Sequence, residues 1–186
     1  MSPQGHDLVV GGSGMLSGLV TALAGQGRRV SVVGRDEHRL AYLAKAAAGI
    51  APLPVDYRDG GLLEAALLRA RRDRGPIERA VCWFHTTAPE IPLAVARHVE
   101  ETYCHVLGSA AADPSSPAVL DQWRTSFADL LPRLDYRIVV LGFVIEPDGR
   151  SRWLTHDEIS AGAAKALAGA APLSIIGTVT PWPSRP

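Results

Sequence analysis

Short apolar runs alternate along this chain with stretches in which apolar residues recur at helical spacing. The runs are rich in Val, Ile, Leu and aromatic residues and have the length of strands. This alternation is typical of a parallel sheet that carries helices on both faces. The pattern predicts strands at 7–11, 29–34, 50–54, 79–84, 102–108, 136–145 and 173–178.

Helices are expected between these strands. The last begins after Thr155, which forms a capping box with Glu158 because each side chain satisfies a free N–H at the helix start. Residues 1–186 are therefore predicted to form a single domain of the α/β class, a three-layer Rossmann fold with a doubly wound parallel sheet of about seven strands. The expected helices are 15–26, 36–48, 60–74, 89–101, 117–131 and 156–169.

Composition and charge narrow the choice of partner. Nineteen basic residues balance nineteen acidic ones, so no net field favours nucleic acid or an anionic membrane. No apolar stretch reaches about 18 residues, and no basic segment precedes the first strand. We expect a cytoplasmic protein with a small-molecule substrate, and its composition leaves a homo-oligomer open. The Pro-rich segment 181–186 is expected to be a surface tail.

The two cysteines, Cys82 and Cys104, each lie inside an apolar strand-like run. A reduced thiol packs there as a small hydrophobic group. Two cysteines without a neighbouring histidine pair cannot supply four ligands, so neither a disulfide nor a metal site is expected.

A glycine-rich segment directly follows the first expected strand. Residues 9–18 read as a strand, a turn and the start of a helix, and the next strand closes on Arg35 about 20 residues later, as in the dinucleotide-binding fingerprint. Gly12 and Gly14 are expected to turn the backbone tightly and to approach a pyrophosphate, whose charge would lie at the N-terminus of a helix that begins near Met15. Ser17 stands at the third fingerprint position, and Gly18 beside it adds room. The alternative is an ordinary glycine turn. The expected cofactor contacts here are Gly11, Gly12, Ser13, Gly14, Met15 and Leu16.

The residues at the end of the second strand distinguish among the possible nucleotide cofactors. An acid there would accept hydrogen bonds from ribose hydroxyls and repel a 2′-phosphate, but this chain has Gly34 followed by Arg35. An arginine can pair with a 2′-phosphate while its planar group stacks on adenine. This pattern favours NADP(H). The alternative is that Arg35 only solvates a helix start that Asp36 caps.

These motifs resemble the short-chain dehydrogenase/reductase superfamily, and the resemblance spans nearly the whole chain. Residues 54–59 resemble a segment in which an aspartate, here Asp56 with Tyr57 beside it, lies against the adenine ring. Ser109 follows the fifth strand, where the family places its catalytic serine. Residues 141–144 resemble a stretch whose backbone faces the nicotinamide carboxamide, which implies cofactor contacts from Gly142 and Val144.

Two departures from the family concern its chemistry. The Tyr-x-x-x-Lys pair, in which the lysine lowers the pKa of the proton-donating tyrosine, is missing from the helix after Ser109. The family's Asn-Asn-Ala-Gly segment after the fourth strand is replaced by residues 83–88, Trp-Phe-His-Thr-Thr-Ala. The resemblance therefore carries over the cofactor site better than the catalytic one.

Candidate catalytic residues follow from the rule that ligands bind at the carboxyl ends of the strands. His85, Ser109 and Gly142 are expected to meet there, with His85 exchanging a proton and Ser109 holding a carbonyl or imine. Alternatively, His85 only hydrogen-bonds a ribose or a backbone group. Tyr103 and His105 are expected to pack against a helix, and Trp83 to be core or pocket wall.

The function expected from these residues is an NADPH-dependent oxidoreductase of the short-chain dehydrogenase type that reduces a small carbonyl or imine with a non-standard active site. The main alternative is a non-catalytic protein that senses NADP(H) through the same site. An isomerase or dehydratase without net redox change is a third possibility.

Overall fold

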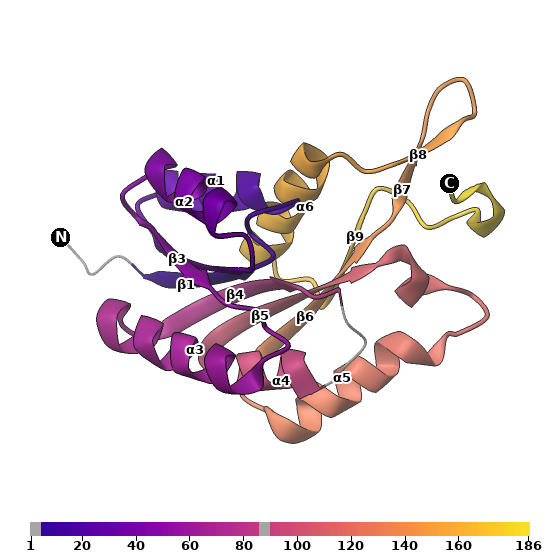
Figure 1. Cartoon of the computed structure of the whole chain (residues 1–186). Helices are drawn as coiled ribbons and strands as arrows, with labels where there is room; N and C mark the ends of the chain where they lie inside the picture. The colour runs from indigo at the N-terminus through magenta and orange to yellow at the C-terminus, as the bar shows by residue number, and fades with distance from the viewer. Residues whose placement is uncertain (1–4, 86–89) are drawn as a thin grey trace.

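The computed structural model describes residues 5–85 and 90–186 (Figure 1). A seven-stranded sheet with the strand order β3-β2-β1-β4-β5-β6-β9 forms the centre, and every neighbouring pair is parallel. The predicted doubly wound sheet is confirmed. The order reverses between β1 and β4, which is where such sheets bind ligands. The strands are β1 (His6–Val10), β2 (Arg29–Gly34), β3 (Ile50–Pro54), β4 (Ile77–Trp83), β5 (Val99–Gly108), β6 (Asp135–Leu141) and β9 (Leu173–Ile176).

Helices cover both faces of the sheet (Figure 1). On one face lie α1 (Ser17–Gly25), α2 (Glu37–Ala46) and α6 (His156–Ala168), and on the other lie α3 (Gly60–Arg74), α4 (Glu90–Ala96) and α5 (Ala118–Leu130). Two short 3₁₀ helices, η1 (Ser109–Ala112) and η2 (Trp182–Ser184), complete the described elements. The three-layer arrangement therefore agrees with the prediction.

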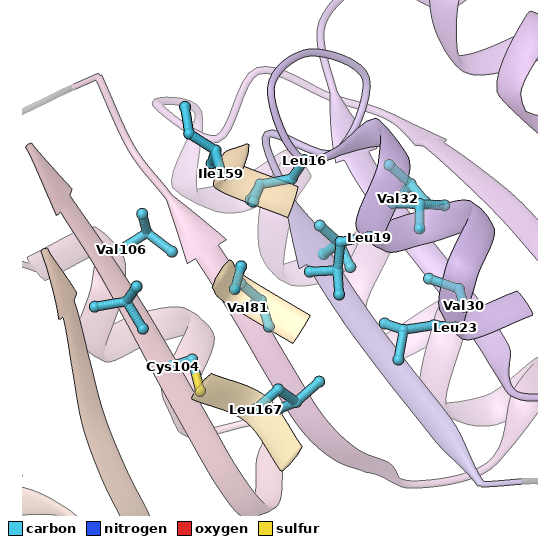
Figure 2. Packing of buried hydrophobic residues seen from close by; sticks show 14 of the residues in the cluster. Leu16, Leu19, Leu23, Val30, Val32, Val81, Cys104, Val106, Ile159 and Leu167 are labelled. Atoms are coloured by element: carbon cyan, nitrogen blue, oxygen red, sulfur yellow. The ribbon is translucent and has the colours of Figure 1, made fainter. Parts of the chain in front are cut away.

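Two apolar cores fill the spaces between these layers. Because successive side chains of a strand point to opposite faces, Val81 of β4 packs under α1 and α6 whereas Cys82 packs on the opposite side. Figure 2 shows Leu16, Leu19 and Leu23 facing the strands that carry Val30, Val81 and Val106, with Ile159 and Leu167 of α6 beside them. These packed layers hold the carboxyl ends of the strands in a fixed arrangement.

The prediction that both cysteines are buried packing groups is confirmed. Cys82 and Cys104 are both buried and free, and burial raises the pKa of each thiol to about 12. Both are therefore neutral thiols that serve as packing groups at neutral pH. Within the described part of the chain, no group of three or more His, Cys, Asp or Glu side chains could hold a metal ion. None of the described helices is both long enough and apolar enough to cross a membrane.

The predicted strand at 136–145 is wrong as a single element. It divides at Gly142 into β6 and β7 (Phe143–Ile145), because the chain there passes so close to residues 176–178 that a Cβ on Gly142 would lie 2.1 Å from the carbonyl oxygen of Thr178. The short strand β7 instead pairs antiparallel with β8 (Ser151–Trp153), which the sequence pattern did not reveal. The resulting hairpin extends beyond the sheet at one end of the molecule (Figure 1).

Other boundaries differ by a few residues. The first helix begins at Ser17 rather than near Met15, since residues 11–16 form turns. The predicted helix 89–101 is the shorter α4, and β5 already begins at Val99; Pro89 lies outside the described residues, as do Thr86, Thr87 and Ala88. The capping box of α6 is present as predicted, with Thr155 and Glu158 each satisfying a backbone N–H of the other.

Candidate functional site

A cleft of about 680 Å³ opens at the carboxyl ends of β1, β2 and β4, next to the point where the strand order reverses. The turn between β1 and α1 forms its floor, and the end of β2 forms one wall. This is the size range of small-molecule and cofactor sites, which occupy about 300–1,000 Å³. The lining residues are Gly11, Ser13, Gly14, Met15, Val33, Gly34, Arg35, Asp36, Arg39, Tyr57, Trp83, His85 and His156.

Three glycines of the turn have three different roles. Gly11 adopts a positive φ of 80°, which L side chains rarely tolerate, and therefore makes the turn. Gly12 is packed against the core, since a Cβ there would lie 2.8 Å from Cγ1 of Val32. Gly14 faces open space: the nearest atom to an added Cβ is the carbonyl oxygen of Gly11, 3.8 Å away. The expectation that Gly12 approaches a ligand is thus replaced by a packing role, while Gly14 keeps room for one.

The start of α1 is fixed by contacts with α6. Leu16 is fully buried in the core, so its side chain does not face the cleft. Ser160 of α6 donates a hydrogen bond to the carbonyl oxygen of Met15 (2.9 Å), and a Cβ on Gly18 would lie 3.0 Å from the Ser160 side chain. Gly18 therefore lets α1 approach α6 closely, and the Met15 carbonyl is held from behind the cleft.

The end of β2 presents positive charge to the cleft. Gly34 has no side chain, so the position typical of a ribose-binding acid carries no carboxylate, and Oγ of Ser13 lies 2.9 Å from where a Cβ would be. Arg35 and Arg39 both line the cleft. Asp36 also reaches it, but its carboxylate accepts from the backbone N–H of Arg39 (3.0 Å) as the N-cap of α2 and pairs with the Arg39 side chain at 3.3 Å.

Asp56 and Tyr57 lie in the loop after β3 and differ in exposure. The carboxylate of Asp56 accepts hydrogen bonds from the Arg58 side chain, which lowers the pKa of the Asp56 carboxyl to about 2. The positive charge of Arg35 adds to this lowering, but the Asp56 side chain is not among those that line the cleft. Tyr57 is buried and lines the cleft, and its hydroxyl accepts a 2.8 Å hydrogen bond from the backbone N–H of His85.

His85 follows β4 and has an exposed side chain that lines the cleft. The indole N–H of Trp83 donates to Nε2 of His85 over 3.1 Å. Trp83 itself is half-buried, and the position of a Cβ on Gly11 would be 3.4 Å from its indole ring. The Trp83 side chain is thus a wall of the cleft, as the sequence predicted.

A second, smaller pocket of about 180 Å³ lies on the other side of Trp83. Ser109, the first residue of η1, contributes a hydroxyl to it and is otherwise buried. Oγ of Ser109 accepts a 2.9 Å hydrogen bond from Nε of Arg185, so segment 181–186 lies at the surface as predicted but is attached to the pocket at this point. The pocket is lined by Trp83, Gly108, Ser109, Leu141, Gly142, Trp153, Leu154 and Ile159.

The structure brings together only part of the predicted catalytic group. Ser109 and Gly142 share the small pocket, whereas His85 lines the larger cleft, and Trp83 borders both. The expectation that His85 meets Ser109 in one cavity is therefore corrected. The backbone N–H of Gly142 donates to the carbonyl oxygen of Ile176 (3.0 Å), so the sheet already uses it. Val144 lies in the β7–β8 hairpin opposite Arg152.

Several residues that line the two cavities were not predicted from the sequence. Arg39 lies in the first turn of α2, whereas Arg35 precedes the N-cap Asp36, so helical spacing does not relate the two arginines and the sequence did not indicate that Arg39 lines the cleft. His156 reaches the cleft from the start of α6, and Trp153 reaches the small pocket from β8. No local pattern indicates either contact, because both depend on how distant segments pack.

No protein-family model matches the chain, and no curated protein matches its sequence. Solved structures do match its fold. A short-chain dehydrogenase from Bacillus anthracis has a TM-score of 0.74 at 14% identity, and the match covers 95% of this chain and 96% of that one. The chain has the fold of a short-chain dehydrogenase. A short-chain dehydrogenase/reductase from Serratia marcescens gives a TM-score of 0.73 at 18% identity, covering 95% and 98% of the two chains. A short-chain type dehydrogenase/reductase from Mycobacterium marinum gives 0.74 at 16% identity, covering 95% of each.

On the side that meets the sheet, α5 carries the aromatic residues Trp123 and Phe127. Trp123 meets His105 edge to face with ring centroids 4.6 Å apart, and Phe127 stacks on Tyr136. Tyr103 and His105 are both buried in this layer, which confirms their predicted packing role. Burial lowers the pKa of His105 to about 3. The face of α5 that meets the sheet is thus committed to packing.

Proposed function

We propose that this chain is an oxidoreductase of the short-chain dehydrogenase type that binds NADP(H) and acts on a small carbonyl or imine compound. The observation that carries the proposal is the cleft beside the glycine turn, where Arg35 and Arg39 stand at the end of β2 and Gly34 excludes a ribose-binding acid. Two guanidinium groups can share the charge of a 2′-phosphate through charge-assisted hydrogen bonds.

The residues of the cleft suit the phosphate-bearing half of such a cofactor. Gly14 leaves space above the turn, and the N-terminus of α1 directs backbone N–H groups and the positive end of the helix dipole toward that space. Arg35 lies within reach of an adenine 2′-phosphate at the β2 end, and Asp36 is already engaged by α2 and Arg39. When bound, NADPH would supply a hydride.

Ser109 is the substrate-side residue in this proposal. Its hydroxyl stands in an apolar pocket where a hydrogen bond to a carbonyl oxygen is stronger than in water. Trp83 lines both this pocket and the cleft, so the two cavities adjoin at its side chain. The placement of His85 in the cleft supports the interpretation that it contacts the cofactor rather than the substrate.

A specific observation favours the alternative, an NADP(H)-binding sensor. The pocket at Ser109 is lined by apolar and indole side chains with glycine backbone, and no carboxyl, imidazole or lysine from the described residues lines it. A reductase must deliver a proton to the substrate oxygen, and here Ser109 would have to pass one from water. A protein that only binds the cofactor needs no such group.

Calorimetry with NADPH and NADH tests cofactor choice, and nicotinamide absorbance with a panel of aldehydes, ketones and imines tests turnover. We expect tighter binding of NADPH and its oxidation by at least one carbonyl or imine class. Binding without oxidation on the whole panel would favour the sensor. Equal or tighter binding of NADH would overturn the NADP(H) proposal.

A further inference from the structure

A guanidinium group is held at the rim of the Ser109 pocket by two indole rings. The Cζ atom of Arg185 lies 5.3 Å from the ring centroid of Trp153 in β8 and 5.1 Å from that of Trp182 in η2. Its Nε donates to Oγ of Ser109. Three contacts from separate segments therefore orient this side chain, so little conformational entropy remains to be lost when a ligand binds it.

The charge of Arg185 has no direct counter-ion. Across residues 5–85 and 90–186, no carboxylate lies within 4.0 Å of its guanidinium nitrogens. Asp113 is near enough for Arg185 to lower its carboxyl pKa, but Oδ1 of Asp113 is occupied by the N–H (2.8 Å) and hydroxyl (2.7 Å) of Ser115. By contrast, the neighbouring Arg152 is paired with Glu146 and Glu158. The two terminal nitrogens of Arg185 carry N–H groups that are available to an anion.

Ser109 can bind a second group at the same time. Because its oxygen already accepts from Arg185, its hydroxyl hydrogen is left to donate. One terminal N–H of Arg185 points in the same direction as its Nε–H, which reaches Ser109, so this N–H and the Ser109 hydroxyl are neighbouring donors. They suit a ligand whose carbonyl oxygen and carboxylate lie on adjacent carbons. The remaining walls are Trp83, Leu141, Trp153, Leu154 and Ile159, which suit an apolar substituent.

We propose that Arg185 and Ser109 form a subsite for a 2-oxo acid with an apolar side chain, with the carboxylate on Arg185 and the carbonyl oxygen on Ser109. The inference rests on the proposed oxidoreductase function for its chemistry. When bound, NADPH would supply a hydride to C2 and become NADP+, and water would supply the proton for the carbonyl oxygen, so that the 2-oxo acid would become a 2-hydroxy acid. Arg185 acts by binding and orienting the acid, since a guanidinium does not release its proton.

The test compares two probes of matched shape by calorimetry on the cofactor-free protein. Benzoylformate carries the carboxylate, and 1-phenyl-1,2-propanedione carries a neutral acetyl group in its place. Arg185→Met removes the charge and keeps much of the side-chain bulk. Arg150→Ala is the matched control, because Arg150 lies on the turn of the β7–β8 hairpin, is 87% exposed and does not line the pocket. NADPH binding is measured on the same samples.

We expect benzoylformate to bind the native protein and to lose roughly 10-fold or more in affinity with R185M, the range for a hydrogen bond to a charged group. The dione should bind R185M and the native protein alike, and R150A should behave as native. Benzoylformate binding that is absent from the native protein, or within twofold in R185M, would overturn the inference. Equal losses for both probes would also overturn it, because they would show that Arg185 only ties its segment to the pocket. If the protein binds NADPH but not benzoylformate, only the proposed subsite is contradicted. If it binds benzoylformate but not NADPH, the proposed function is contradicted and the subsite is still supported.

Discussion

Trp83 and His85 are joined by a hydrogen bond that borders both cavities of this protein. The indole N–H donates to Nε2 of His85 over 3.1 Å, and the two rings meet edge to face with centroids 5.3 Å apart. When Nε2 accepts this bond, the proton of the neutral imidazole is on Nδ1, which is then a donor. Trp83 of β4 thereby orients the imidazole of His85 in the cleft.

This contact can be measured by a double-mutant cycle. Trp83→Phe keeps the aromatic packing and removes the donor, and His85→Ala removes the acceptor. We expect a coupling free energy of about 0.5–1.5 kcal/mol in urea unfolding, the net value of one hydrogen bond. Additive losses in the double variant would show that the two side chains are not coupled in solution.

His85 and Ser109 are expected to affect different ligands, because they line different cavities. His85→Ala should weaken NADPH binding by roughly 2–12-fold, the equivalent of about 0.5–1.5 kcal/mol. Ser109→Ala should leave NADPH affinity unchanged and raise KM or lower kcat for the carbonyl substrate. A fall in turnover of roughly 10²–10⁴-fold in H85A with native NADPH affinity would instead identify His85 as the general acid.

The glycine turn offers a pair of substitutions with opposite effects. Gly14→Val should abolish NADPH binding and leave stability nearly native, since a side chain there meets open space that the pyrophosphate needs. Gly12→Ala should lower the free energy of unfolding by about 1–3 kcal/mol, because its Cβ would press on Val32 and Val20. Calorimetry and urea unfolding of both variants separate the two roles. Unchanged NADPH affinity in G14V would show that the turn has only a structural role.

Arg35 and Arg39 should set the preference for NADPH over NADH. Arg35→Ala is expected to cost about 1.5–3 kcal/mol of NADPH binding free energy, the range for hydrogen bonds to charged groups, with little change for NADH. Arg39→Ala should have a smaller effect in the same direction, since Arg39 also pairs with Asp36. Arg69→Ala on the exposed face of α3 is the control for loss of one positive charge. Equal losses for both cofactors in R35A would remove the argument for a 2′-phosphate site.

Stability should fall in mild acid because of buried histidines. Burial lowers the pKa of His105 to about 3. Below pH 6.5, His105 therefore binds a proton in the unfolded chain but not in the native protein. Between pH 8 and pH 5 this single group should cost about 2 kcal/mol of unfolding free energy. Burial also lowers the pKa of His6, which adds to the slope in the same direction.

Urea unfolding at several pH values checks this expectation. His105→Gln should reduce the slope of stability against pH between 6.5 and 3 while leaving the contribution of His6. A slope that is identical in H105Q and in the native protein would contradict the assignment of this proton to His105.

The sequence by itself determined the layered fold and the end of the sheet at which the larger cleft lies. Apolar strand-like runs that alternate with helical stretches bury their residues in a parallel sheet covered on both faces. The glycine turn before α1 is a local feature, so its geometry follows from neighbouring residues in the chain. Gly14 and Arg35 were therefore found from neighbours in the chain, and the capping box at Thr155 was found in the same way.

Only the tertiary structure decided which side chains from distant segments contact each other at the site. Gly12 became a packing residue because α1 lies close to β2, and β6 ended at Gly142 because the segment after β9 passes beside it. The sequence could place Ser109 and Arg185 at the ends of separate elements, but their contact spans 76 residues and depends on the β7–β8 hairpin. Contacts of this kind arise from the packing of elements that have no periodic relation in the sequence, so no local pattern encodes them.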